Sequence, residues 1–127
     1  MSTTESAAAD RTIVEFPASE GYRSVGRLVL GGIASRFELP IDRVDDLLLA
    51  IESLFMQERV SGTIRLEADA SSEELRVRIG PFRPGRLQDP GLERVLTRLV
   101  DGVDERVDGD SASIELLVSA AYRRAQT

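Results

Sequence analysis

Two short segments in the middle of the chain, residues 63–68 and 74–79, alternate apolar and polar side chains with a period of two. This period is typical of β-strands that bury one face and expose the other to water. The residues between the segments, 69–73, have the composition of a turn, so we expect an antiparallel hairpin. The side chains expected to face the core are Ile64, Leu66, Ala68, Leu75, Val77 and Ile79. A sheet with one apolar face needs a second layer of structure to cover it, which restricts the choice of fold.

The segment at 44–56 precedes this hairpin and has its apolar residues at helical spacing, which predicts a buried helix. Asp42 is expected to be the N-cap of this helix, and the helix is expected to end near Gln57. Asp45 and Asp46 then lie in the first turns, where the helix dipole favours negative charge.

One row of this helix carries a carboxylate among apolar side chains. At a spacing of four residues the row contains Val44, Leu48, Glu52 and Met56. Residues four apart lie on the same side of a helix, so Glu52 is expected to point along an apolar stripe. A carboxylate in that position does not fit a purely structural helix, and Glu52 is therefore a candidate functional residue.

The remaining elements follow from similar patterns. We expect a strand at 12–16, a helix at about 19–37, a loop at 80–89 and a closing hairpin from 103–107 and 112–119. Between the loop and this hairpin we expect an amphipathic helix with Asp89 as its N-cap, which stops around 101–102. The apolar residues of that segment run from Leu92 to Val103. The order β-α-α-β-β-α-β-β predicts an α+β fold, a two-layer sandwich with a mostly antiparallel sheet and three helices on one face. Residues 1–11 are expected to be a disordered lead, 12–119 a single domain and 120–127 a polar tail.

The residue types that are absent limit the possible chemistry. The sequence contains no Cys, His, Trp, Lys or Asn. This excludes disulfides, a thiol nucleophile, an imidazole base, an ordinary zinc site, a lysine Schiff base and a Walker A loop. The net charge of −6 argues against general binding of nucleic acid. No apolar run approaches the about 18 residues of a membrane helix, and the N-terminus lacks the features of a signal peptide, so we expect a cytoplasmic protein.

The order of elements and two local motifs resemble a known family. Residues 45–52 read Asp-Asp-x-x-Leu-Ala-Ile-Glu, and the helix after the hairpin begins Gly-Leu and continues to Leu-Val-Asp-x-Val at 99–103. Over residues 12–119 this pattern resembles the anti-sigma-factor serine/threonine kinases of the GHKL ATPase (histidine-kinase-like) superfamily, which implies a Bergerat-like fold. The resemblance implies that Glu52 is the catalytic acid. It also implies that Arg27 lies near the position where family members present an arginine to a sigma factor or a partner subunit.

The nucleotide-binding motifs of that family are altered in this sequence. Met56 stands where the family has the Asn that holds Mg²⁺, and a thioether is a poor ligand for a hard cation. Gly80 lies within Arg-Ile-Gly-Pro-Phe at 78–82, which replaces the adenine-binding Asp-x-Gly-x-Gly motif and lacks its acid. Gly91 begins Gly-Leu-Glu in place of Gly-x-Gly, so Glu93 puts a negative charge at the helix start that would receive phosphate. Gly80 and Gly91 are therefore degenerate cofactor-binding positions, and we expect Mg-ATP binding to be lost.

The preferred hypothesis is a pseudokinase, a regulatory module that keeps the fold as a protein-binding surface. Its expected partners are a sigma factor, an anti-anti-sigma protein of the STAS type or a second copy of the chain, with no cofactor, metal, nucleic acid or membrane involved. In this hypothesis Glu52 is a vestigial acid, and Phe55 and Met56 fill the former nucleotide cavity.

Two alternatives remain open. The first is an active serine/threonine kinase that inhibits a sigma factor and binds Mg-ATP through atypical ligands, with Glu52 joined by Asp45 or Asp46 at the metal. The second is a domain that binds a small ligand in the cleft between the helix at 44–56 and the loop at 80–89.

Overall fold

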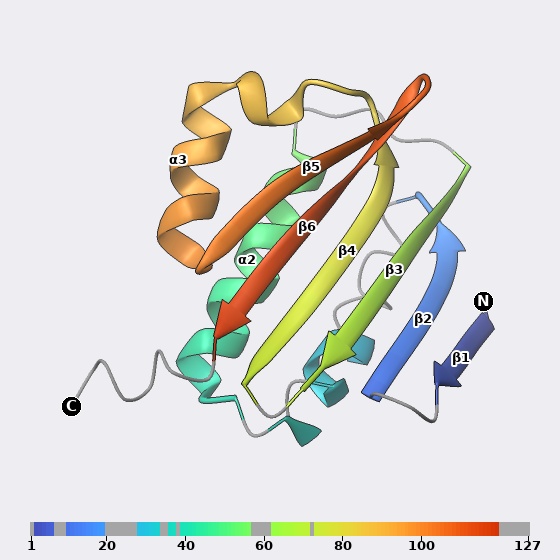
Figure 1. Cartoon of the computed structure of the whole chain (residues 1–127), viewed down its shortest axis with the longest axis vertical. Helices are drawn as coiled ribbons and strands as arrows, with labels where there is room; N and C mark the ends of the chain where they lie inside the picture. Colours follow the sequence, from blue (N-terminus) through green and yellow to red (C-terminus); the bar gives the residue numbers. More distant parts are fainter. Residues whose placement is uncertain are drawn as a thin grey trace.

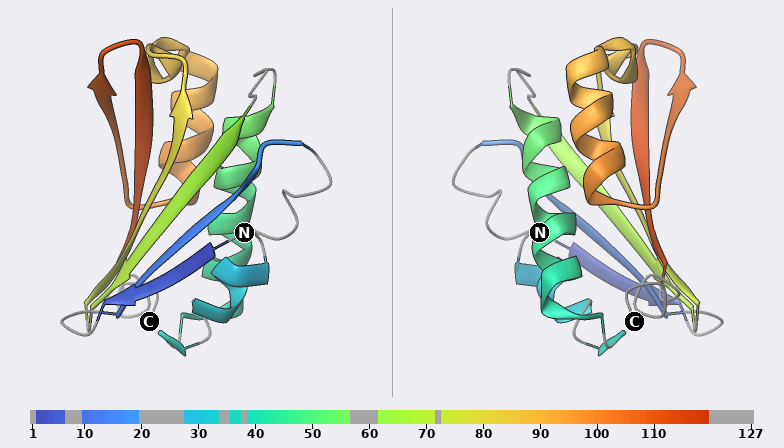
Figure 2. Two further views of the ribbon diagram at one scale, coloured as in Figure 1. Left: turned by 90° about the vertical axis from the view of Figure 1, so that its right-hand side faces the viewer. Right: turned by 90° about the vertical axis from the view of Figure 1, so that its left-hand side faces the viewer.

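The computed structural model describes residues 2–6, 10–19, 28–33, 36–37, 39–56, 62–71 and 73–119. These residues form an α+β fold in which one six-stranded sheet, of order β1-β2-β3-β4-β6-β5, has its helices on one face (Figures 1 and 2). The strands are β1 (Ser2–Ser6), β2 (Asp10–Pro17), β3 (Thr63–Ala70), β4 (Glu74–Phe82), β5 (Gly102–Asp108) and β6 (Ser111–Ser119). The helices are α2 (Ile41–Phe55), α3 (Pro90–Leu99) and the 3₁₀ helix η1 (Arg86–Gln88), and residues 28–33 are also helical. All neighbouring strands pair antiparallel, so the predicted α+β class, antiparallel sheet and helical layer are confirmed.

The central hairpin predicted from the alternation is present as β3 and β4. Its register pairs Leu66 with Ile79 and Ala68 with Val77, which places the apolar side chains of both strands on the same face. All the side chains predicted to face the core in this hairpin are buried. The closing hairpin is also confirmed, and β6 adds three fully buried residues to the same face, Ile114, Leu116 and Val118.

Part of the predicted disordered lead is a strand in the structure. Residues 2–6 form β1, which pairs with β2 from Ser2 opposite Glu15 to Ser6 opposite Arg11, and β2 itself begins at Asp10. The sequence of β1, Ser-Thr-Thr-Glu-Ser, has no apolar alternation that would mark a strand. An edge position needs only backbone N–H and C=O groups to complete the pairing, so a polar segment can occupy it. The predicted tail, residues 120–127, lies outside the described residues.

The two predicted helices before the hairpin are seen to different extents. In the first, residues 28–33 are helical and bury Leu30 and Ile33 in the core, whereas residues 20–27 lie outside the described part of the chain. The second helix, α2, is confirmed, but its predicted N-cap was wrong. The carbonyl of Pro40 already accepts the N–H groups of Arg43 (2.9 Å) and Val44 (3.1 Å), so Pro40 is the N-cap residue and Asp42 lies in the first turn.

A buried arginine on α2 joins the helical layer to the sheet. The side chain of Arg43 is only 7% exposed, and its guanidinium donates hydrogen bonds to Asp46 (3.2 Å), to the Leu99 carbonyl at the end of α3 (3.1 Å) and to Asp101 (2.9 Å). The same oxygen of Asp101 accepts the backbone N–H of Ser119 at the end of β6 (2.7 Å). One side chain therefore fixes α2, the C-terminal end of α3 and the end of β6 relative to one another.

Among the described residues, no helix is long and apolar enough to cross a membrane. The face of the sheet away from the helices carries mainly charged side chains, including Arg65, Glu67, Arg76, Arg78 and Glu115. The core therefore lies entirely between the sheet and its one helical layer.

We expect Arg43→Ala to lower the free energy of unfolding by about 2 kcal/mol, because it leaves the Leu99 carbonyl and the Asp101 carboxylate, which is 37% exposed, without their charged partner. Urea denaturation of the purified protein measures this change. Arg98→Ala, on the exposed surface of α3, is the matched control and should change stability by no more than about 0.5 kcal/mol. Equal, small effects of both substitutions would contradict the role assigned to Arg43.

Candidate functional site

Glu52 lies at the edge of the buried face of α2, and not along its centre. The centre of that face consists of fully or nearly fully buried apolar residues, namely Leu47, Ala50, Ile51, Leu54 and Phe55. Val44, Leu48 and Glu52 are half-buried, and Met56 is 64% exposed. The row predicted as an apolar stripe is therefore the boundary between core and solvent, where a carboxylate keeps contact with water.

A surface groove runs between the C-terminal end of α2 and the N-terminal end of α3. It has a volume of about 340 Å³, and we call it the α2–α3 groove. Its lining residues are Ser53 and Met56 beside α2, Arg86 of η1, Asp89, and Gly91, Leu92 and Val95 of α3. The structure thus brings together two of the predicted site residues, Met56 and Gly91. Glu52 and Gly80 do not line this groove.

The prediction that Met56 fills a former nucleotide cavity was wrong. Helix α2 ends at Phe55, and Met56 has an extended backbone that turns its side chain out to the mouth of the groove. Phe55 is in the core, as predicted, and packs edge-to-face against Phe82 at the end of β4 with ring centroids 5.6 Å apart. This aromatic pair fills the space between α2 and the end of β4. The α2–α3 groove, lined by Met56, Arg86 and Asp89, opens between α2 and the later part of the loop predicted at 80–89.

Val95 was also expected on the buried face of its helix. Several apolar residues in α3 and just after it were predicted to pack on the core. Leu96 and Val100 are buried as predicted, whereas Val95 is 45% exposed. The reason is that α3 lies at the edge of the helical layer and contacts mainly α2, so its apolar stripe is wider than the surface it covers.

Arg86 holds η1 against the end of α2. Its guanidinium donates to the carbonyls of Ser53 (3.5 Å) and Leu54, which belong to the last turn of the helix. Carbonyls at a helix C-terminus lack the full set of partners of the helix interior and carry the negative end of the helix dipole, so an arginine stabilises them. The Ser53 carbonyl also accepts the N–H of Met56, the C-cap residue (3.3 Å). The sequence showed Arg86 only as one of several loop arginines, and its partners could not be inferred without the tertiary structure.

The loop before η1 is anchored by an internal carboxylate. Glu105 of β5 accepts the backbone N–H groups of Gly85 (2.7 Å) and Leu87 (3.2 Å) through its two oxygens. Gly85 has a φ of 94°, a left-handed conformation that glycine adopts without strain. These two backbone donors are therefore already bonded to an anion that belongs to the protein.

The N-terminus of α3 is capped in the same way. Asp89 accepts the N–H groups of Gly91 (2.9 Å) and Leu92 (3.4 Å) on one carboxylate oxygen, and Pro90 occupies the first helical position, as predicted. Free N–H groups at a helix N-terminus form the usual binding site for a phosphate. Here a carboxylate occupies them, and Glu93 in the first turn adds a second negative charge.

Gly80 lies away from the α2–α3 groove. It is buried in β4, where a bulge interrupts the pairing with β6 between Ile79 and Phe82. A Cβ atom at Gly80 would lie 3.0 Å from the carbonyl oxygen of Ala112 and 3.1 Å from the Cα atom of Ser113. The glycine therefore permits the close approach of two strand backbones, and its place in the fold is explained by packing.

The other predicted residues add no metal site. Asp46 pairs with Arg43, and no three acidic side chains in the described part of the chain lie close enough together to hold a metal ion. Arg27, predicted to contact a partner, lies outside the described residues. No model of a known protein family matches the chain, and a search of curated proteins found no match either.

We expect Gly80→Ala to lower the free energy of unfolding by about 1–3 kcal/mol, because the new methyl group collides with backbone atoms that have little room to move. The matched control is Gly32→Ala, a helical position where no other atom lies within 4 Å of the added Cβ. Alanine there should be neutral or stabilising by up to about 1 kcal/mol. Thermal and urea denaturation measure both variants, and a neutral effect at Gly80 would contradict its assignment to strand packing.

Proposed function

We propose that the protein is a non-catalytic regulatory module of the partner-switching type, which binds another protein through the α2–α3 groove. In this proposal the sandwich is a Bergerat-like fold whose nucleotide site is degenerate, and the partner is a sigma factor, an anti-anti-sigma protein of the STAS type or a second copy of the chain. The proposal rests on one observation: the backbone N–H groups that a phosphate would need already donate hydrogen bonds to carboxylates of the protein itself.

Two carboxylates occupy those donors. Asp89 binds two N–H groups at the start of α3, and Glu105 binds the N–H groups of Gly85, just before η1, and of Leu87, within η1. A nucleotide would have to displace both acids and then tolerate their charge close to its phosphates. With Met56 in place of an oxygen ligand for Mg²⁺, the site also lacks the usual means of neutralising that charge.

The surface of the groove favours a protein ligand. Met56 is 64% exposed, Leu49 is 51% exposed and Val95 is 45% exposed. Leu49 and Ser53 are one turn apart on the same side of α2, so Leu49 extends the groove by one turn towards the N-terminus of that helix. Exposed apolar side chains gathered beside a groove with a polar rim are typical of protein-binding surfaces.

The first alternative, an active kinase, finds less support. Asp46, one of its proposed metal ligands, is held by Arg43, and Asp45 lies two helical turns before Glu52, which is a rise of about 10 Å along the helix axis. That spacing does not suit two ligands of one Mg²⁺ ion, which bind at about 2.1 Å.

We expect isothermal titration calorimetry with Mg-ATP and with Mg-ADP to show no binding at ligand concentrations up to about 1 mM. The reason is that the backbone donors are occupied and no oxygen ligand replaces the expected Asn at Met56. Dissociation constants in the micromolar range for either nucleotide would overturn the proposal of a degenerate site and favour the kinase alternative.

The protein-binding surface can be tested with a photo-crosslinking amino acid placed at Met56 in the native host. We expect one discrete adduct, identified by mass spectrometry as a sigma factor, a STAS-type protein or a second copy of the chain. Val95→Glu should reduce this adduct at least about fivefold, because it puts a charge on the apolar side of the groove. The matched control places the crosslinker at Arg76, on the opposite face of the sheet. No adduct at position 56, or the same adducts at both positions, would contradict the proposal.

A further inference from the structure

Strand β5 forms one edge of the sheet. In the described part of the chain it pairs with β6 on one side and with no strand on the other. Figures 1 and 2 show β5 at this edge, with α3 in the helical layer and not in the plane of the sheet. Edge strands are commonly protected from further pairing by proline, a bulge, a short length or charged side chains. β5 has seven residues and no proline, so its charged side chains decide which strand can pair with it.

The turn between β5 and β6 determines which backbone groups of β5 face the open side. A two-residue turn separates the paired residues Asp108 and Ser111, so these two form a hydrogen-bonded pair. Hydrogen-bonded and non-hydrogen-bonded pairs alternate along an antiparallel ladder. The backbone N–H and C=O groups of Val103, Glu105 and Val107 therefore point away from β6, towards the open side.

The side chains of these three residues share the helical face of the sheet. Val103 packs against the core, and Glu105 reaches the loop before η1. Val107 follows on the same face and is 60% exposed. Asp104 and Arg106 alternate with them and so lie on the outer face. The open edge thus carries an apolar side chain on one face and two opposite charges on the other.

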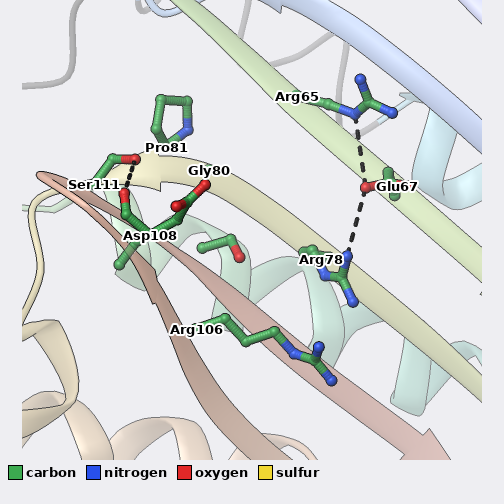
Figure 3. A pocket seen from close by; sticks show the side chains of 10 residues that line it. Arg65, Glu67, Arg78, Gly80, Pro81, Arg106, Asp108 and Ser111 are labelled. Carbon is green, nitrogen blue, oxygen red and sulfur yellow. Dashed lines mark hydrogen bonds and ion pairs between the residues drawn. The ribbon is translucent and has the colours of Figure 1, made fainter.

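The two charges on the outer face are available for a partner. Arg106 is 56% exposed and borders a hollow of about 240 Å³ above Gly80 (Figure 3). Its guanidinium lies 3.9 Å from Glu115, which is beyond the range of a hydrogen bond, and Arg78 is closer to that acid at 3.1 Å. Among the described residues, the exposed carboxylate of Asp104 has no ion pair or hydrogen bond.

The sequence of β5 is complementary to itself in one antiparallel register. When two copies pair symmetrically about Glu105, Asp104 of each copy lies opposite Arg106 of the other, and Val103 lies opposite Val107. Opposite charges that face each other across a strand pair stabilise it, and like charges destabilise it. A register centred on Asp104 or on Arg106 places that residue opposite its own like charge. Registers centred on Val103 or Val107 pair fewer than half of the strand's residues.

The favoured register also places Glu105 opposite itself, on the helical face. Each Glu105 carboxylate accepts the N–H groups of Gly85 (2.7 Å) and Leu87 (3.2 Å) of its own chain, which direct it to the loop and not across the strand pair. On the same face, Val107 of one copy would cover Val103 of the other. This contact would bury an apolar side chain that a single copy leaves exposed.

We propose that β5 pairs antiparallel with β5 of a second copy about Glu105, so that two six-stranded sheets join edge to edge. The occupant of the edge is a second copy because β5 itself supplies both members of each charged pair and of each valine pair. The interface lies at the sheet edge and not in the α2–α3 groove, so this inference does not depend on the proposed function.

Sedimentation equilibrium of the full chain tests the self-association. We expect a dimer with a dissociation constant below about 100 µM, as for a small interface made by one strand pair. Arg106→Asp and Asp104→Arg should each weaken this dimer at least about tenfold, because like charges then face each other. An equimolar mixture of the two variants should form a dimer with one copy of each, since all four charges then meet an opposite charge. No dimer of the unmodified chain, or no recovery in the mixture, would overturn the proposal.

Two control variants locate the interface. Arg65→Asp makes the same charge change at a 52% exposed position of the outer face, but on β3, and should leave the dimer unchanged. Val95→Glu, in the α2–α3 groove, should also leave it unchanged. Loss of the dimer in Val95→Glu but not in Arg106→Asp would assign self-association to the groove and contradict pairing through β5. Urea denaturation of each variant shows whether its fold is intact.

Cysteine variants measure the register directly, because the chain contains no cysteine of its own. Residues opposite each other in a non-hydrogen-bonded pair have Cα atoms about 4.5 Å apart, which a disulfide can span. We mix Asp104→Cys and Arg106→Cys in equal amounts, oxidise them and identify the products by mass spectrometry. The bond between positions 104 and 106 should make up at least about 80% of the disulfide dimers, against about half for random pairing. Random proportions, or no disulfide, would contradict the register.

Discussion

Burial of one face of the antiparallel sheet is the constraint on which the rest of the structure depends. Four neighbouring strands, β2, β3, β4 and β6, send their apolar side chains to the same side, and the helices can lie only there. Arg43 then sets the position of α2 relative to α3 and to the end of β6 through its buried hydrogen bonds. The two faces of the protein differ as a result: one carries a groove between helices, and the other is a charged sheet surface.

The groove shows how a protein can satisfy, with its own acids, the backbone donors that would otherwise bind an anion. Asp89 and Glu105 come from different elements, a helix cap and a strand, yet each accepts two backbone N–H groups near the start of α3. A carboxylate and a phosphate need the same donors, so the presence of one disfavours the other. This physical competition disfavours binding of a phosphate near the start of α3.

Much of the fold could be predicted because its signals are local. Alternation identified the strands and the direction of side chains such as Leu66 and Val77, and Asp89-Pro90 marked the start of α3 correctly. β1 was missed because an edge strand needs only backbone pairing, and the start of α2 was misplaced because Pro40 offered a carbonyl where the sequence suggested a side-chain cap. Both errors concern backbone hydrogen bonds, which leave little trace in the pattern of side chains.

For the candidate site, too, some properties follow from the sequence and others follow only from the tertiary structure. The sequence by itself determined the chemistry that is available, since it contains no Cys, His, Lys or Asn and places Glu93 at a helix start. Only the tertiary structure decided that Met56 and Gly91 share a groove while Gly80 lies in the sheet beneath a separate hollow, and that Glu105 reaches back to the loop before η1. The physical reason is that these relations join residues far apart in the chain, and their geometry depends on how the helical layer packs on the sheet.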